Sequence, residues 1–500
     1  MRLSSKHAAQ QTALFSDFRG GLNTSSTSEM IADNQLFDVV NMELDANDAL
    51  LRTAHGTRDV YRLFAGDVIM QGAYDVLNKS LFLFLSSGKI MARKGMGDFR
   101  AIGRLTGRGP VRTAAWEDGL LIASGGRLQY AKGGTSVETI VSSPPVCKDV
   151  YTRSGRVLVY DDADIVRFSG VGDKANWKQD SNDASAALFA QIGYKVGGRL
   201  MGMFPLTADV LFIKSNGMVF RLRNEYPNWA ITELGRNIHC VGEEAFCNVG
   251  QTALILGRGS LSEVMTTQDY GDMTARNIGA HVENALSQLP STARLRYVPQ
   301  LGQMWGIAGG KYVLVYDCLH GAFFQRYFNS DVVDVVSAPD VIYVLKKDAV
   351  SELAPKTFED AGKPMAFRAR FKDKSSLHSI VAKRAVLNIT PLVGFYADSR
   401  SEMEVGGRFE VRLPFPARLK KQEGGVSNVV APRIPACLMS SSFVGGNHAD
   451  VFLNPEYISP NEAIFMRGRI FCRDAHIRLR IHGKGFPFIL NYIGYDMAEV

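Results

Sequence analysis

The chain has 500 residues, 46% hydrophobic and 21% charged, which is typical of a globular protein with a sizeable core and excludes a disordered or fibrous chain. Its net charge is +7, and residues 361–500, with 20 basic against 12 acidic residues, hold the basic excess. Apolar runs reach only about five residues and the start lacks an apolar signal segment, so neither a membrane-spanning helix nor secretion is expected. We therefore expect synthesis in a cytoplasm.

The first 59 residues are expected to form an N-terminal arm and a lead-in to the fold. Residues 1–17 are polar and small, which predicts a mobile or partner-docked arm. After them, Gly20 and Gly21 indicate a turn. Asp33 is placed to start a short amphipathic helix, and the segment from Val39 to Leu44 predicts a strand.

Seven hairpins follow, and residues 207–223 show their pattern most clearly. The apolar run Val210–Ile213 is followed by Ser215–Gly217, which supplies the positive φ angles of a tight turn. Met218–Arg223 then alternates apolar with polar residues, as a half-buried strand does. The pattern recurs, more weakly towards the end, at Leu81–Met91, Leu120–Tyr130, Val157–Phe168, Ala253–Gly259, Met304–Tyr316 and Val341–Val350.

The spacing of these hairpins predicts a β-propeller. The first residues of consecutive apolar runs are 39, 37, 53, 43, 51 and 37 residues apart, close to the roughly 40 to 50 residues of one four-stranded blade. One hairpin cannot bury both of its faces, whereas blades packed in a ring bury each other's. We expect a mostly β fold with a six- or seven-bladed propeller-like body at 60–355.

Two stretches depart from this pattern. Residues 169–198 predict an insertion at the rim of a blade, and within it Asp180 to Ile192 predicts a loop with one short helix. Residues 361–364 indicate a linker, after which alternating strands are expected, with loops at Lys420–Gly425 and Ser440–Gly446. We assign residues 365–500 to a smaller β-rich C-terminal domain, some of whose strands could return to the propeller. The expected strands are Phe367–Lys372, Val386–Ile389, Phe409–Leu413 and Ile470–Arg473.

Three stretches carry a resemblance to a known family. The opening has Phe-Arg-Gly-Gly-Leu-Asn at 18–23, Asn-Gln at 34–35, Asn-Met-Glu-Leu-Asp at 41–45, Leu-Arg at 51–52 and Gly56. The second stretch is Asn277–Gln288, and the third is the ending, Arg478–Asp496, with its Gly-Phe-Pro-Phe-Ile-Leu strand and closing aromatic residue. Together they resemble the tail hub or nozzle proteins of short-tailed bacteriophages, also called packaged-DNA stabilisation proteins.

This resemblance implies a structural role in the virion tail without catalysis, cofactor or small-molecule substrate. In that family the subunits form a ring, a hexamer, below the portal and adaptor proteins and above the needle, fibre or spike proteins. The ring extends the DNA channel, retains the packaged genome and conducts DNA during ejection, with transient and non-specific contacts to the duplex. It also implies that a short helix follows a propeller strand at Asn277–Gln288.

Two other functions stay open. No phosphate-binding loop, zinc-protease motif or nucleophile elbow occurs, and the six cysteines have no metal-site or disulfide spacing. A glycan-binding or glycan-cleaving propeller is the alternative, because glycoside hydrolysis needs two facing carboxylates; the candidates are Glu243, Glu244, Asp269 and Asp272. A monomeric scaffold for protein partners is the third possibility.

Basic residues in the C-terminal part are the interface or DNA-channel candidates. Arg368, Arg370 and Lys372 alternate with apolar residues, as do Arg478 and Arg480, so each set lies on one face of a strand. Such a face is either simply solvated, or it meets an acidic neighbouring subunit or the DNA backbone, where contacts are independent of base sequence. The loop lysines Lys420 and Lys421 complete the candidate set.

Overall fold

The computed structural model describes residues 11–64, 66–161, 164–206, 208–266, 273–355, 357–392, 395–396, 403–406, 408–412, 438–442, 457–458, 461, 463–485 and 487–499. The chain divides into two compact units. Unit 1 comprises 1–58, 314–329 and 353–500, and unit 2 comprises 59–313 and 330–352. The fold is mostly β, with short helices only at η1 (Ala280–Val282), α1 (Glu283–Ser287) and η2 (Pro299–Leu301) in the described residues.

Six four-stranded sheets follow one another along the chain, each in simple sequence order. The first three consist of β8 (Ile69–Asp75), β9 (Ser80–Leu85), β10 (Lys89–Lys94) and β11 (Arg100–Arg104); β12 (Arg112–Trp116), β13 (Gly119–Ala123), β14 (Gln129–Lys132) and β15 (Ser136–Thr139); β16 (Asp149–Arg153), β17 (Arg156–Tyr160), β18 (Ile165–Phe168) and β19 (Leu188–Gln191). The next three consist of β20 (Leu200–Leu206), β21 (Asp209–Lys214), β22 (Val219–Arg223) and β23 (Ala230–Gly235); β24 (Phe246–Val249), β25 (Thr252–Gly257), β26 (Ser260–Thr266) and β27 (Met273–Asn277); β28 (Arg294–Val298), β29 (Gln303–Ile307), β30 (Tyr312–Asp317) and β31 (Ala322–Tyr327).

The seventh sheet joins strands from distant parts of the sequence. Its order begins β32 (Val332–Ser337), β33 (Ile342–Lys346), β34 (Ala349–Ala354) and β7 (Gly56–Arg62), so a lead-in strand completes the last blade. Two short strands, β35 (Glu359–Asp360) and β36 (Lys363–Pro364), extend this sheet beyond β7. Because a strand from before the first blade pairs with a strand of the last blade, the propeller closes without leaving long free edges.

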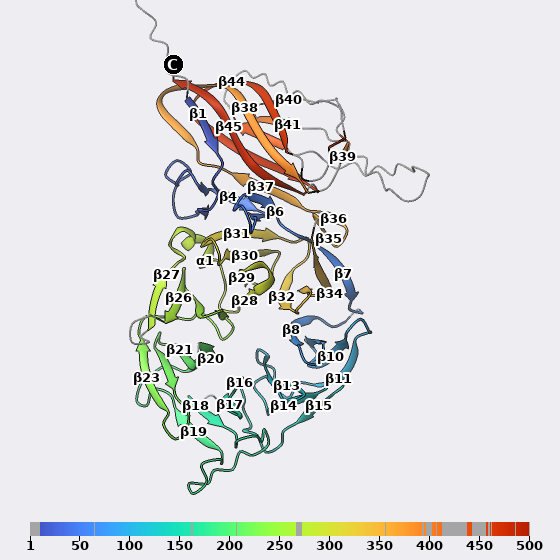
Figure 1. Ribbon diagram of the computed structural model, residues 1–500, viewed down its shortest axis with the longest axis vertical. Helices are drawn as coiled ribbons and strands as arrows, with labels where there is room; N and C mark the ends of the chain where they lie inside the picture. Colours follow the sequence, from blue (N-terminus) through green and yellow to red (C-terminus); the bar gives the residue numbers. More distant parts are fainter. Residues whose placement is uncertain are drawn as a thin grey trace, which may run out of the picture. The chain divides into compact units, whose positions relative to one another are not determined.

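The sheets form a closed ring. First strands of neighbouring sheets touch from β12 through β16, β20, β24 and β28 to β32, and β32 touches β8 of the first sheet. The first and second sheets touch through their outer strands, β11 and β15, and share a core. Figure 1 shows the sheets in this order around a centre. The first and seventh sheets share a core in which Leu83 and Leu85 pack with Val336 and Leu345. The propeller therefore has seven blades, within the predicted range of six or seven.

The hairpin prediction is confirmed at all seven places. Each predicted stretch contains the second strand of one sheet, and all but Ala253–Gly259, which ends at the turn before β26, also reach the third strand. Second strands such as β9, β13 and β21 are buried along their whole length, because neighbouring blades cover both faces. For this reason nearly all of their residues are apolar. Turn glycines such as Gly88 and Gly217 have φ angles of 80° and 82°, which side chains disfavour.

Two helix predictions are wrong. Around Asp33 the chain makes turns and then a short strand, β3 (Gln35–Leu36), which pairs with β2 (Gly21–Leu22). Between Asp180 and Ile192 it makes turns and then β19, so this stretch supplies the outer strand of the third blade. The carboxylates of Asp180 and Asp183 accept backbone N–H groups two residues ahead, at 2.9 and 2.8 Å. Such local bonds compete with helix formation.

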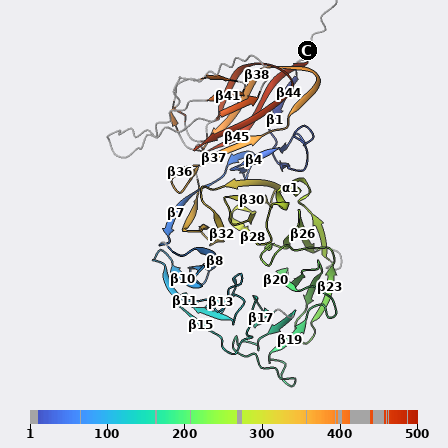
Figure 2. The ribbon, with the colours of Figure 1, turned by 180° about the vertical axis from the view of Figure 1, so that it is seen from behind.

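Unit 1 is built on three long strands, β38 (Lys374–Pro391), β44 (Ile464–Lys484) and β45 (Phe488–Glu499). Figure 2 shows them running side by side. The prediction of a loop at Ser440–Gly446 is wrong for its first three residues, which belong to β42 (Leu438–Ser442), a strand that pairs with β44. The other strands are β1 (Gln11–Phe15), β4 (Asp38–Val40), β5 (Met42–Leu44), β6 (Leu51–Thr53), β37 (Ala366–Arg370), β39 (Phe395–Tyr396), β40 (Met403–Gly406), β41 (Arg408–Arg412), β42 (Leu438–Ser442) and β43 (Tyr457–Ile458).

The two ends of the chain share the sheet of unit 1. β45 pairs with β1 along Ile493–Met497, and with β6 at Ile489 and Leu490. The lead-in at 1–59, predicted as a segment of its own, therefore contributes strands to the same unit as the C-terminal residues.

We expect Gly494→Val to detach β1. A Cβ atom at Gly494 lies 2.3 Å from the carbonyl oxygen of Ala13, a backbone atom that cannot move aside while the strands stay paired. Amide hydrogens of residues 11–15 should then exchange about tenfold faster or more. Ala498→Val, in the same strand but beyond the β1 pairing, is the control. Unchanged exchange in Gly494→Val would contradict this role of the glycine.

Candidate functional site at the centre of the propeller

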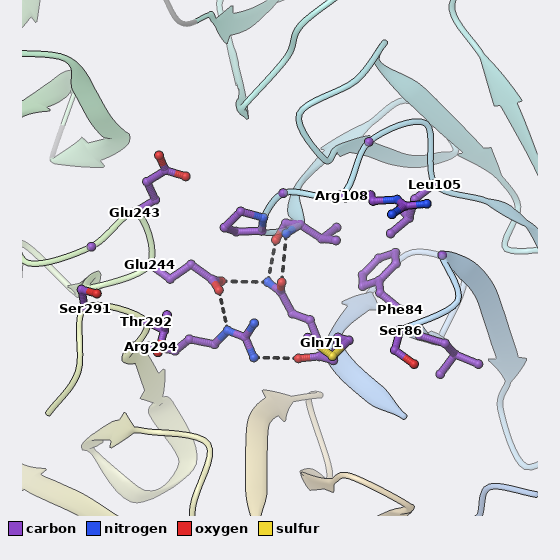
Figure 3. Close-up of a pocket in the computed structure, with 18 of the residues that line it drawn as sticks. Gln71, Phe84, Ser86, Leu105, Arg108, Glu243, Glu244, Ser291, Thr292 and Arg294 are labelled. Atoms are coloured by element: carbon purple, nitrogen blue, oxygen red, sulfur yellow. Dashed lines mark hydrogen bonds and ion pairs between the residues drawn. The ribbon is translucent and has the colours of Figure 1, made fainter. Parts of the chain in front are cut away.

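The loop before β24 brings two glutamates to the centre of the ring. Gly242 precedes them, and a Cβ atom there would lie 1.9 Å from the carbonyl oxygen of Ser291, so only glycine fits this approach. Glu244 is 5% exposed. Its Oε2 accepts a hydrogen bond from Arg294 Nε at 2.5 Å, and its Oε1 accepts one from Gln71 Nε2 at 3.0 Å (Figure 3). Oε1 also accepts a hydrogen bond from Arg296 Nη2 at 2.7 Å.

These bonds extend into a network through several blades. The Gln71 amide both donates to the Val111 carbonyl at 2.5 Å and accepts from the Val111 N–H at 2.9 Å. Arg296 Nε donates to Asp334 Oδ1 at 2.9 Å, and Asp334 Oδ2 accepts the Gly72 N–H at 3.2 Å. We call Gln71, Glu244, Arg294, Arg296 and Asp334 the Glu244 network. It joins the first, fifth, sixth and seventh sheets and, through Val111, reaches the segment before the second.

Glu243 makes looser contacts with the remaining blades. The Arg112 side chain donates to its backbone carbonyl. Its Oε1 lies 3.9 Å from Lys148 Nζ and 3.8 Å from Arg199 Nη2, beyond ordinary hydrogen-bond length. These partners lie at the starts of the second, third and fourth sheets. Because Gln71 and Arg112 belong to sheets that are not neighbours of the fifth, their contacts with Glu243 and Glu244 cross the centre of the ring.

The electrostatics keep this centre ionised. Burial opposes the charge of Glu244, but Arg296, Arg294 and Arg112 outweigh it and lower the pKa of its carboxyl to about 2. Burial likewise opposes the charge of Arg296, yet Asp334 and Glu244 raise its pKa above the ordinary value. A carboxylate with this pKa holds no proton near neutral pH, so Glu244 does not fit the general acid of a glycosidase.

A second buried carboxylate, Asp149, behaves in the opposite way. It accepts the N–H groups of Val150 and Met203 at 2.8 and 3.2 Å, which ties the third sheet to the fourth. Burial raises the pKa of its carboxyl to about 6, although Arg112 acts against this rise. Asp149 is therefore partly protonated in mildly acidic solution.

We expect the contribution of Asp149 to the stability of unit 2 to be larger in mild acid than near neutral pH. The folded protein binds a proton at Asp149 more tightly than the unfolded chain does, so stability rises as pH falls from about 7 to 4. At 1.36 kcal/mol per pKa unit the contribution is about 3 kcal/mol. The stability of the wild type relative to Asp149→Asn should grow by this order between pH 8 and 4, measured by thermal unfolding. Asp180→Asn, at an exposed turn, is the control; a pH-independent difference would contradict the assignment.

A cavity of about 940 Å³ opens beside the Glu244 network. Figure 3 shows Glu243, Ser291 and Thr292 on one side of it, and Leu105 and Arg108 on the other. Its charged lining consists of Arg104, Arg108, Arg199, Arg294, Glu243 and Glu244. Of the carboxylates predicted for a glycosidase, Glu243 and Glu244 both line this cavity, whereas Asp269 and Asp272 lie outside the described residues.

The basic residues predicted as an interface lie in unit 1, on β37, on β44 and after β37. Alternation is confirmed on β37, where Phe367 and Ala369 are buried and the arginines between them are not. Arg368 Nε lies 2.5 Å from Asp38 Oδ2, Arg370 Nη2 lies 2.6 Å from Asp373 Oδ2, and Lys372 Nζ lies 3.2 Å from Asp33 Oδ1. Their charges are therefore met by carboxylates of the same chain, and any outside acidic partner would compete with these.

The remaining predicted basic residues are only partly described. Arg478 and Arg480 lie in β44, where Arg478 is opposite Ser442, and Arg480 is opposite Ser440 on one side and Arg370 on the other. Lys420 and Lys421 lie outside the described residues. Sequence reasoning missed Gln71, Arg294, Arg296 and Asp334; only the Arg-Leu-Arg alternation at 294–296, like that at 478–480, was a usable signal.

In the described part of the chain, no group of three or more His, Cys, Asp or Glu side chains could hold a metal ion. No helix among the described residues is long and apolar enough to cross a membrane.

Comparisons with known proteins give structural likenesses, two of which follow. No protein-family model matches the chain, and no curated protein matches it. The WD40 β-propeller domain of Doa1 matches with a TM-score of 0.42 and 11% identity, covering 60% of this chain and 97% of that one. The extracellular domain of BT4673 from B. thetaiotaomicron matches with a TM-score of 0.43 and 9% identity, covering 71% and 49%.

Proposed function

We propose that the chain is a structural subunit of a short-tailed phage tail, a hub or nozzle protein that extends the DNA channel. The observation that carries this proposal is that the two terminal stretches of the resemblance meet in unit 1. Leu51 and Arg52 of the opening pair in register with Leu490 and Ile489 of the ending. Residues more than 400 positions apart thus belong to one structural unit, as expected if the resemblance reflects a shared fold.

The side chains of the opening also have specific structural roles. Asn41, with a φ angle of 54°, donates to the carbonyls of Tyr327 and Ala366 at 3.1 and 2.7 Å, and accepts the Tyr327 N–H at 2.7 Å. Asn23 donates to Gln35 at 2.8 Å in a buried position. Gly21 has a φ angle of 59°, and a Cβ atom there would lie 2.8 Å from backbone atoms of Phe323. Substitution of Asn41 or Asn23 removes specific hydrogen bonds, and a side chain at Gly21 would clash with backbone atoms, so these positions of the opening are structurally constrained.

The propeller supplies a rigid body in this role. Its own centre is crossed by the Glu244 network, so a DNA duplex has no path through a single subunit. The duplex instead passes through a ring of subunits, a hexamer by the resemblance, whose head-to-tail interfaces close by rotation. Portal and adaptor proteins bind above and needle, fibre or spike proteins below, and contacts with the duplex are to its phosphates.

The cavity beside the Glu244 network favours the alternative, a glycan-binding or glycan-cleaving propeller, because its volume suits a small ligand. The molar mass of the assembly in solution distinguishes the tail protein from the glycan-acting propeller. Light scattering of the purified full-length chain, alone and with its adaptor protein, should give a closed oligomer of about six chains. A monomer under all conditions, together with polysaccharide turnover that Glu243→Gln abolishes, would overturn the proposal.

A further inference from the structure

The cavity beside the Glu244 network carries an excess of positive charge. Four arginines and two glutamates line it, which leaves two positive charges in excess. Arg294 and Glu244 neutralise each other at 2.5 Å. The remaining arginines, Arg104, Arg108 and Arg199, are exposed on the cavity wall and are opposed only by Glu243.

These three arginines keep donors for a ligand. Arg104 uses one nitrogen, Nη2, to donate to the Ser87 carbonyl at 2.8 Å, which orients its guanidinium. Arg199 reaches Glu243 only at 3.8 Å. Arg108 makes no side-chain hydrogen bond or ion pair with any residue that the structure describes.

We propose that this cavity binds a small molecule through a phosphate group. A phosphate carries a charge of about −1.5 to −2 at neutral pH, which matches the excess of two positive charges. Guanidinium groups bind its oxygens through paired hydrogen bonds. Ser291 and Thr292 add exposed hydroxyl groups to the lining, on the side of the cavity opposite Arg108. This site is independent of the ring assembly and needs only the folded propeller.

The floor of the cavity limits the ligand to a small molecule. Gln71, Glu244 and Arg294 close the centre with bonds of 2.5 to 3.0 Å, so a DNA strand cannot thread past them. The volume of about 940 Å³ lies at the upper end of the roughly 300 to 1,000 Å³ of small-ligand sites. A cavity of one dominant charge within protein walls also concentrates counter-ions from solution.

Calorimetric titration of the full-length protein with inorganic phosphate and with glucose 6-phosphate tests the site. The double substitution R108A/R199A should weaken binding at least about tenfold, because each charge-assisted bond contributes more than an ordinary one. Glu243→Gln removes the one opposing charge and should tighten binding about threefold. Arg258→Ala, which removes an exposed arginine that does not line the cavity, should leave binding unchanged.

The two probes show whether the cavity prefers the free phosphate ion or a phosphate ester. Tighter binding of glucose 6-phosphate than of inorganic phosphate indicates a phosphate ester, and equal binding indicates the free ion; both support the site. Equal affinity of wild type and R108A/R199A, or no binding of either probe, overturns it. Binding of a short DNA duplex without binding of either small probe also overturns it, in favour of backbone contacts at the rim.

Discussion

Replacing Glu244 by alanine should destabilise the propeller by about 3 to 5 kcal/mol, the typical cost of breaking a buried ion pair on one side. The carboxylate is 6% exposed and faces two arginines whose side chains are 16% and 18% exposed. Without it Arg296 keeps Asp334, and Arg294 keeps two backbone carbonyls, but the cluster has one uncompensated positive charge. The thermal midpoint of the transition that unfolds unit 2 measures the loss.

Glu243→Ala is the matched control. Glu243 precedes Glu244 in the sequence, but its carboxylate lies 3.8 and 3.9 Å from its basic partners and its side chain is 23% exposed. We expect it to cost less than about 1 kcal/mol, as for exposed ion pairs. Equal effects of the two substitutions would contradict a central role for Glu244.

Acid should reveal the same interaction in the wild type. Because the pKa of Glu244 is lowered to about 2 in the folded protein, its contribution is present above about pH 4.5 and is lost as pH falls towards 2. The sign is opposite to that of Asp149, so the two carboxylates separate in a pH titration of stability.

The second large effect is expected in unit 1 for Glu43→Ala. Glu43 on β5 accepts a hydrogen bond from Arg326 Nη2 on β31 at 2.5 Å, and the two side chains are 4% and 2% exposed. Arg326 is already buried, so removing the carboxylate takes away its counter-charge. This should lower the free energy of unfolding by about 3 to 5 kcal/mol. The thermal midpoint of unit 1 should fall by several degrees.

Two further variants give this prediction its controls. Asp48→Ala removes an exposed carboxylate of the same unit and should leave the free energy of unfolding within about 0.5 kcal/mol of the wild-type value. Replacing both Glu43 and Arg326 by methionine removes the pair without leaving a lone charge, and should recover most of the loss. A double variant as unstable as Glu43→Ala would show that shape, and not charge, causes the effect.

The repeated hairpins could be predicted because their signals are local. Second strands such as β9 and β21 are covered on both faces, so every residue in them is selected to be buried, and a turn glycine follows. Closure of the ring could not be predicted in this way. The strand that completes the seventh sheet, β7, lies almost 300 residues before its partner β34.

The site was less predictable than the fold. Glu244 was visible as a carboxylate near a blade boundary, but its partners Gln71 and Arg296 reach it only because the ring brings distant sheets to one centre. The basic strand Phe367–Lys372 had the predicted alternation, yet its acidic partners Asp33 and Asp38 come from the other end of the chain. Contacts of this kind depend on topology and leave no periodic pattern in the sequence.

Imaging of the assembled protein by electron cryomicroscopy, with double-stranded DNA bound, tests the proposed role most directly. We expect a closed ring in which the duplex lies on the axis between subunits, while the Glu244 network blocks the centre of every propeller. Duplex density inside a propeller, or a lone subunit that never forms a ring, would contradict the account.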